Sequence, residues 1–208
     1  MEVPEEVLLD LNELGKDKKF VGLGDFVVSD DQNLLAYTID YTGFRQFTLR
    51  VKDLRTGQAL PDTAERVTSL AWASDNKTLF LVTEDAVTKR SDKLWRHVLG
   101  TTKFEEIYND KDELFDIGVG KTLDERFLLL GSESKDSTEW SVADADLGVD
   151  QPFALRTVFA RRAYRVRRRA PQGTLLRSHQ RHRAQLPARH RRRASARPRR
   201  RRRADRGA

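Results

Sequence analysis

The chain has 208 residues, no cysteine, and a net charge of +7 that is divided unevenly along its length. Residues 1–160 carry 19 basic and 31 acidic side chains, whereas residues 161–208 carry 20 basic side chains and one acidic one. The absence of cysteine excludes a disulfide framework, a thiolate metal site and a cysteine nucleophile.

The amino terminus and the apolar runs indicate where the protein resides. Residues 1–6 lack the basic and apolar regions of a secretory signal. No apolar run approaches the roughly 18 residues that a membrane span requires. We therefore expect a soluble, cytoplasmic protein with no membrane partner.

Short, alternating apolar segments follow the amino terminus and predict half-buried strands. Ser29–Asn33 and Tyr41–Gly43 contain short polar side chains and a glycine, which favour tight turns between such strands. The first three expected strands, in chain order, are residues 26–28, 34–37 and 47–51. Together these segments predict an antiparallel meander.

The same turn and strand phrases recur further along the chain. A Ser-Asp pair at 29–30 recurs 45 residues later at 74–75, and Leu123-Asp124 repeats it more loosely after a further 49 residues. An outer-strand phrase at 51–57 recurs at 96–101 with the same offset of 45 residues. Repeats of about 40–50 residues with about four strands each are typical of β-propeller blades.

The chain is therefore predicted to be all-β, with two parts. Residues 1–160 are expected to form a partial β-propeller of about three four-stranded blades, and residues 161–208 a disordered, arginine-rich tail. The alternative is a β-sandwich whose strands merely resemble one another. An incomplete ring is also expected to leave unpaired edges and uncovered blade faces at its ends.

Catalytic candidates are scarce in the predicted blades. No Gly-x-Ser-x-Gly spacing exists that could form a nucleophile elbow. His97 is the one histidine before residue 160, and we interpret it as a strand residue with a polar contact rather than as a general base. No catalytic, cofactor-binding or metal-binding residue is predicted.

Two further patterns could suggest a binding site. Asp30, Asp75 and Asp124 recur with the blade, which marks them as turn formers rather than as an acid pair or a metal cluster. Gly118–Thr122 has some likeness to a phosphate-binding loop, but Phe115 stands where that motif needs its first glycine. We interpret this segment as a strand followed by a turn.

Several separated phrases resemble, in the same order, the propeller of the prolyl oligopeptidase family of serine peptidases. The phrases at 95–101 and 153–162 are more similar to its oligopeptidase B branch. The resemblance covers residues 5 to about 162, roughly three blades of the family's seven-bladed ring. It rests on Glu5–Asn12, Val28–Asp31, Leu35–Tyr37, Leu94–Thr101, Lys111–Phe115 and Phe153–Arg162.

The resemblance implies a division of labour. In that family the propeller is a non-catalytic cap, and a downstream α/β-hydrolase domain with a Ser-Asp-His triad cuts short peptides, after basic residues in the oligopeptidase B branch. The implied partners of an intact relative are therefore a peptide substrate and the hydrolase domain of its own chain. This chain by itself is expected to be an inactive propeller fragment.

The segment from Arg161 onward changes in composition. It contains 20 arginines and no lysine, phenylalanine, tryptophan or isoleucine. As a disordered polycation it would bind nucleic acid non-specifically through counterion release, most densely at Arg199–Arg203. On this alternative, the protein is a non-catalytic interaction protein whose basic tail binds nucleic acid.

A second interpretation is a change of reading frame near Arg161–Tyr164. GC-rich coding DNA that is read out of frame yields arginine, alanine and proline without lysine. A shift of one nucleotide lets permitted codons for Arg165–Arg168 and Arg177–His190 encode strand-like sequence that resembles the next propeller strands of the family. We therefore expect the tail to be a frameshift product.

Overall fold

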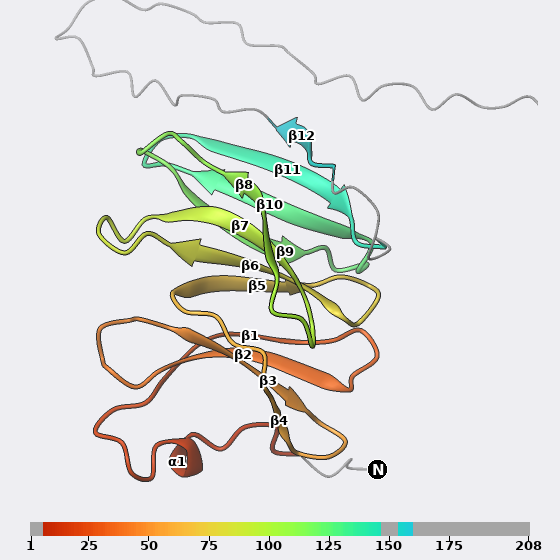
Figure 1. Ribbon diagram of the computed structural model, residues 1–208. Helices are drawn as coiled ribbons and strands as arrows, with labels where there is room; N and C mark the ends of the chain where they lie inside the picture. Colours follow the sequence, from red (N-terminus) through yellow and green to blue (C-terminus); the bar gives the residue numbers. More distant parts are fainter. Residues whose placement is uncertain (1–5, 147–153, 160–208) are drawn as a thin grey trace, which may run out of the picture. The chain divides into compact units, whose positions relative to one another are not determined.

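The computed structural model describes residues 6–146 and 154–159. Within these residues the chain forms one short helix and twelve strands (Figure 1). They are α1 (Leu11–Leu14), β1 (Gly22–Val28), β2 (Leu34–Asp40), β3 (Thr48–Asp53), β4 (Ala59–Leu60), β5 (Val67–Trp72), β6 (Thr78–Glu84), β7 (Ser91–Val98), β8 (Phe104–Asn109), β9 (Asp116–Lys121), β10 (Phe127–Glu133), β11 (Thr138–Asp144) and β12 (Arg156–Phe159).

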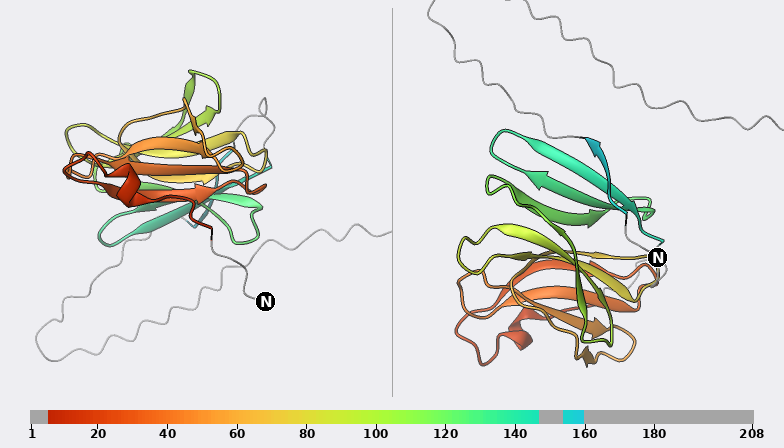
Figure 2. Two further views of the ribbon diagram at one scale, coloured as in Figure 1. Left: turned by 90° about the horizontal axis from the view of Figure 1, so that it is seen from below. Right: turned by 45° about the horizontal axis from the view of Figure 1, so that its top comes forward.

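The strands form three four-stranded antiparallel sheets in chain order. The first sheet has the order β1-β2-β3-β4, the second β5-β6-β7-β8 and the third β9-β10-β11-β12. The right view in Figure 2 agrees with Figure 1 in showing the sheets as successive layers. The predicted partial propeller with three four-stranded blades is confirmed, whereas the predicted tail lies outside the described residues.

Apolar side chains fill the space on both sides of the second sheet. Because successive strand residues point to opposite faces, Leu79 and Leu81 pack towards the first sheet, and Phe80 and Val82 pack towards the third. All four side chains are at most 1% exposed. A single twisted sheet cannot bury both of its faces, so the second sheet depends on both neighbours.

The outer face of the first sheet is covered by the amino-terminal segment. Leu35, Tyr37 and Ile39 form a buried cluster, against which apolar side chains from residues 8–23 pack. Gly15 lets this segment turn closely, because a Cβ atom there would lie 2.7 Å from Val21 Cγ1. The expectation of an uncovered face at both ends is therefore wrong for the first sheet, because the apolar residues before β1 provide its cover.

The third sheet has an open outer face. Trp140 of β11 is 38% exposed and Val158 of β12 is 62% exposed. On the opposite face, Leu128 and Leu130 are buried against the second sheet. The three layers therefore have one covered end and, among the described residues, one open end.

The first hairpin of each sheet is closed by the same turn. In each case a backbone N–H donates to the carbonyl five residues later, and one turn residue has a positive φ, namely Gln32 (61°), Asn76 (56°) and Glu125 (58°). Ser29, Ala73 and Thr122 donate the closing hydrogen bonds. The predicted recurrence of the turn is confirmed, but its predicted alignment is shifted by one residue, because Ser29 corresponds to Ala73 and not to Ser74.

Candidate functional site

The turn aspartates follow this corrected alignment. Asp31 accepts hydrogen bonds from Ser29 Oγ (2.6 Å) and Asn33 N (3.1 Å), and the Ser29 contact lowers the pKa of its carboxyl. Asp75 accepts from Thr78 N and Oγ1, and the Thr122 hydroxyl lowers the pKa of Asp124. Turn formation by Asp75 and Asp124 is thus confirmed.

Asp30 has a different role from the predicted one. Its neighbour Asp31 stands at the equivalent turn position, because the first two turns are one residue out of step with the matched Ser-Asp pairs. Asp30 instead binds Lys121 Nζ, which lies 2.7 Å from Oδ1 and 2.5 Å from Oδ2. This ion pair joins the turn after β1 to the end of β9 in the third sheet. Both residues line a cavity of about 440 Å³ at the ends of β1, β5 and β9.

The innermost strands of successive sheets are linked by a repeated side-chain contact. Asp25 of β1 accepts a hydrogen bond from Leu70 N of β5 at 2.7 Å. Ser69 of β5 accepts one from Val119 N of β9 at 3.0 Å. Counting back from the aligned turns, Ser69 occupies in β5 the position of Asp25 in β1, and Gly118 occupies it in β9. The repeated link therefore has no side chain to continue it from the third sheet.

His97 is enclosed between the first and second sheets. Its side chain is 1% exposed, its Nδ1 lies 3.0 Å from Lys103 O, and its Nε2 lies 2.8 Å from Asp62 Oδ1. Nδ1 donates to the carbonyl, since a carbonyl oxygen only accepts. Phe104 stacks on the imidazole with ring centroids 4.2 Å apart. The ring therefore holds the segment before β5 against the β7–β8 turn, and neither nitrogen is available to a substrate.

Gly118–Thr122 lies in the last part of β9 and the start of the next turn. Gly118 and Gly120 alternate with Val119, which is buried against the second sheet. No helix follows the segment among the described residues, so it lacks the helix amino terminus that binds phosphate in a phosphate loop. The interpretation as a strand followed by a turn is confirmed.

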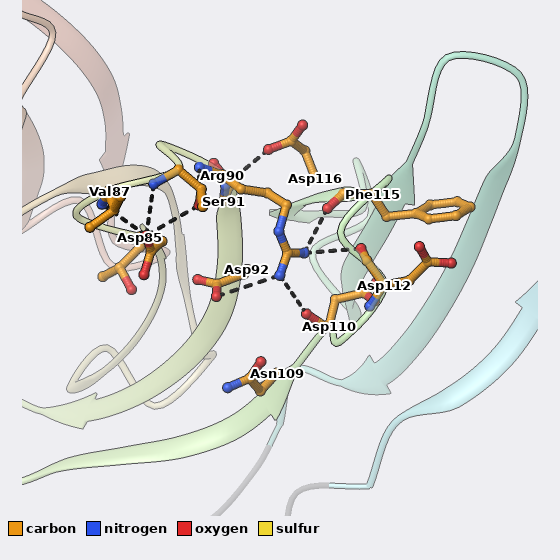
Figure 3. A network of polar contacts seen from close by, with 12 residues as sticks. Asp85, Val87, Arg90, Ser91, Asp92, Asn109, Asp110, Asp112, Phe115 and Asp116 are labelled. Atoms are coloured by element: carbon orange, nitrogen blue, oxygen red, sulfur yellow. Dashed lines mark hydrogen bonds and ion pairs between the residues drawn. The ribbon is translucent and has the colours of Figure 1, made fainter.

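Arg90 organises the connection between the second and third sheets (Figure 3). Its guanidinium points at the loop that joins β8 to β9 and donates to the carbonyl oxygens of Asp110 (2.9 Å), Asp112 (3.2 Å) and Phe115 (2.9 Å). A guanidinium presents several donors in a fixed plane, which suits three convergent carbonyls. This one side chain therefore ties three carbonyl groups of the loop together.

Asp92 balances the partly buried charge of Arg90. Its Oδ2 lies 3.7 Å from Arg90 Nη2, and its Oδ1 is buried with no hydrogen-bond partner. Nearby, Ser132 Oγ donates to Asp110 Oδ2 at 2.7 Å. Among the described residues no group of three or more histidine, aspartate or glutamate side chains is placed to hold a metal ion. Asp92 and Asp110 therefore take part in the polar contacts around this loop.

The contacts of the histidine in residues 6–146 and 154–159 differ from those of a catalytic base. His97, the one histidine among them, pairs with Asp62, but its other nitrogen faces a carbonyl and not a hydroxyl. A serine nucleophile needs such a nitrogen as its base.

In the same residues, no helix has the length and apolar character needed to cross a membrane.

Several residues that shape the site were missed from the sequence. Arg90 binds backbone carbonyls, which carry no residue-specific signal. Asp25 and Ser69 each accept a hydrogen bond from a backbone N–H of the next sheet. That N–H lies about one blade further along the chain, so the pairing gives no local signal. Gly118 and Gly120 resemble part of a loop motif in the sequence, although glycines two apart in a strand also leave one face of that strand without side chains.

The chain matches the family model described as "Prolyl oligopeptidase, N-terminal beta-propeller domain" over residues 1–183. Dipeptidyl aminopeptidase BI of Pseudoxanthomonas mexicana is 42% identical over 138 residues, which cover 65% of this chain and 19% of that protein. Protease 2 of Moraxella lacunata is 33% identical over 147 residues, covering 68% and 21% respectively. The chain thus spans about a fifth of the length of these relatives.

Solved structures show the same likeness. Oligopeptidase B from Leishmania major superimposes with a TM-score of 0.70 at 27% identity, covering 76% of this chain and 22% of that one. Oligopeptidase B from Trypanosoma brucei gives a TM-score of 0.68 at 29% identity, covering 78% and 23%.

Proposed function

The chain belongs to the family of prolyl oligopeptidase N-terminal β-propeller domains, and we propose that residues 1–160 supply the first three blades of an oligopeptidase-B-like serine peptidase. The observation that carries this proposal is the succession of three sheets whose innermost strands are joined by equivalent contacts, Asp25 to Leu70 and Ser69 to Val119. In this role the blades form a non-catalytic wall that limits access to a hydrolase domain.

The proposed substrates are short peptides, cut after basic residues by the hydrolase domain of the complete protein. The likeness to two oligopeptidase B structures supports this choice. The described residues of this chain contribute no nucleophile and base of their own, so peptidase activity depends on a hydrolase domain. We propose that the 208-residue chain alone is inactive and resides in the cytoplasm.

A second candidate activity is the release of dipeptides from peptide amino termini. It is favoured by the 42% identity to a protein named dipeptidyl aminopeptidase BI. The two activities share the propeller and the reaction type, and they differ in the substrate end that is recognised.

We also propose that the arginine-rich segment arises from a frameshift near Arg161–Tyr164. Its support is the composition of residues 161–208 together with the strand-like sequence that a one-nucleotide shift recovers. The alternative, an interaction protein with a nucleic-acid-binding tail, concerns residues outside the described part and stays a prediction.

Sequencing of the gene tests the frameshift. The codons for residues 158–164 and the downstream DNA would be read in several independent isolates. We expect the shifted frame to encode further propeller strands and a Gly-x-Ser-x-Gly hydrolase domain. A single intact frame that requires the arginine-rich segment in every isolate contradicts the proposal.

An activity assay tests the peptidase role. The frame-restored protein and the 208-residue chain would be compared on an arginyl aminomethylcoumarin substrate with a blocked amino terminus. We expect turnover by the restored protein only. Turnover of an unblocked dipeptidyl substrate but not of the blocked one would instead support the second candidate, and no turnover of either contradicts both.

A further inference from the structure

We propose that the open face of the third sheet is a docking site for a β-strand segment that inserts an arginine side chain beside Trp140. This proposal depends on the proposed function in one respect only, namely that the docking strand belongs to a further sheet of the complete protein. The receiving site, here called the Trp140 hollow, is a cavity of about 430 Å³. Its lining includes Gly118, Gly120, Leu129, Gly131, Glu133 and Trp140.

The floor of the hollow is made of glycines. Gly118 and Gly120 of β9 lie opposite Gly131 and Leu129 of β10, so three of four paired positions project no side chain. A Cβ atom at Gly120 would meet no atom within 4 Å. The hollow therefore has room for a long side chain from outside the sheet, and its volume lies within the usual range of about 300–1,000 Å³ for ligand pockets.

Trp140 forms one wall. It pairs with Gly131 across β10 and β11, and a Cβ atom on that glycine would lie 3.0 Å from Trp140 Cζ3 and 3.1 Å from Cη2. The indole thus lies over Gly131 yet is 38% exposed. An exposed indole beside an empty space is a platform on which a guanidinium can stack.

The charges at the end of the hollow select a cation. Glu133 pairs directly with Asp116 across β9 and β10, and like charges in this position destabilise a sheet. Asp116 uses Oδ1 to accept a hydrogen bond from Ser91 N. No described residue that lines the hollow is basic, and Arg156 of the same sheet pairs with Val142 outside it. An inserted arginine would supply the missing positive charge.

The contacts between the other sheets explain why this face differs. Asp25 and Ser69 each reach from one sheet to a backbone N–H of the next, but Gly118 stands at the equivalent place in the third sheet. The third sheet therefore cannot continue this particular contact with a further neighbour. In our proposal the Trp140 hollow instead receives a side chain from the neighbouring segment. The contact then runs from the neighbour to the third sheet and not from the third sheet to the neighbour.

Peptide binding to the full 208-residue chain tests the proposal. The probes are acetyl-Thr-Val-Arg-Val-Thr-amide and the same peptide with citrulline, a neutral analogue of nearly the same shape, in place of arginine. Binding is followed by the indole N–H signals of the three tryptophans in ¹H–¹⁵N NMR spectra, with Trp140 assigned from Trp140→Phe. We expect a saturable shift of the Trp140 signal and about tenfold weaker binding of the citrulline peptide, because charge-assisted hydrogen bonds are lost.

Two variants locate the site. Glu133→Gln should weaken the binding of the arginine peptide about tenfold. Glu113→Gln makes an equal change of charge at an exposed residue outside the hollow and should leave binding unchanged. Gly120→Val fills open space with a strand-favouring residue, so it should abolish binding without lowering the melting temperature.

Equal affinity for arginine and citrulline, no saturable Trp140 shift, or unchanged binding by a folded Gly120→Val variant would each overturn the proposal. These measurements do not depend on the downstream gene or on peptidase activity. The docking site and the proposed function can therefore fail independently.

Discussion

The second and third sheets have the same strand order and the same first turn, but among the described residues only the second is covered on both faces. Phe80 of β6 is fully buried, whereas Leu129, at the equivalent place in β10, is half-buried beside the exposed Trp140. Five consecutive residues of β6 are buried, from Thr78 to Val82. Burial in these blades therefore depends on the neighbouring sheet more than on the strand itself.

A pair of leucine substitutions should produce the largest difference between the two sheets. Leu81→Ala opens a cavity in the core between the first and second sheets and should lower the free energy of unfolding by about 2–5 kcal/mol. Leu129→Ala on the open face should cost less than about 1 kcal/mol, because little packing is lost. Urea denaturation of the full chain measures both. Similar losses would show that the open face is covered.

Arg90→Lys should have the next largest effect. Lysine keeps the charge but cannot donate to three carbonyls in one plane, so the loop between the second and third sheets loses directed hydrogen bonds. We expect a loss of about 1.5–3 kcal/mol in unfolding free energy. Arg55→Lys, at an exposed turn of the first sheet, serves as the matched control and should change little. An equal effect of both variants would remove Arg90 from its proposed role.

The buried carboxylate of Asp40 should make the first sheet sensitive to acid. Burial raises its pKa, but hydrogen bonds donated by Thr42 and by Arg45 N outweigh that effect, and the pKa is lowered overall. Its stabilising contribution is therefore present above the unfolded pKa of about 3.9 and is lost as the pH falls through the lower folded value. Asp40→Asn should cost about 1 kcal/mol at pH 7.

The pH dependence provides the check on Asp40. The difference in unfolding free energy between the parent chain and Asp40→Asn should narrow as the pH falls below about 4. A difference that stays constant from neutral to acidic pH would show that the variant acts through shape alone.

The ion pair between Asp30 and Lys121 should give the smallest effect. It joins the first and third sheets with both side chains partly exposed, at 21% and 14%. A double-mutant cycle with Asp30→Asn and Lys121→Met should yield a coupling of about 0.5 kcal/mol that weakens with salt. A coupling that does not respond to salt would indicate contact through packing.

Much of the fold could be predicted from the sequence because turns and alternating strands are local features. The turns that contain Asn76 and Glu125, for example, share one hydrogen-bonding pattern, and the short polar residues in the sequence favour such turns. The alignment slipped at Asp30 because two adjacent aspartates offered the same signal, and only the closing hydrogen bonds distinguish them.

The contacts between sheets could not be predicted in the same way. Lys121 and Asp30 are 91 residues apart, so their pairing depends on the stacking of whole sheets. The cover that Leu8 and Val21 provide for the first sheet is also non-local. The hollow beside Trp140 depends on two glycines facing outwards, which requires the orientation of β9 to be known.

Hydrogen exchange of the full chain tests the central claim most directly, through the strands β6 and β10, which hold equivalent places in the second and third sheets. The amides of residues 78–84 should exchange distinctly more slowly than those of residues 127–133, because in the part of the chain that the structure describes only the former strand is covered on both faces. Equal protection of the two strands, or slower exchange in β10, would contradict the claim that the outer face of the third sheet is uncovered.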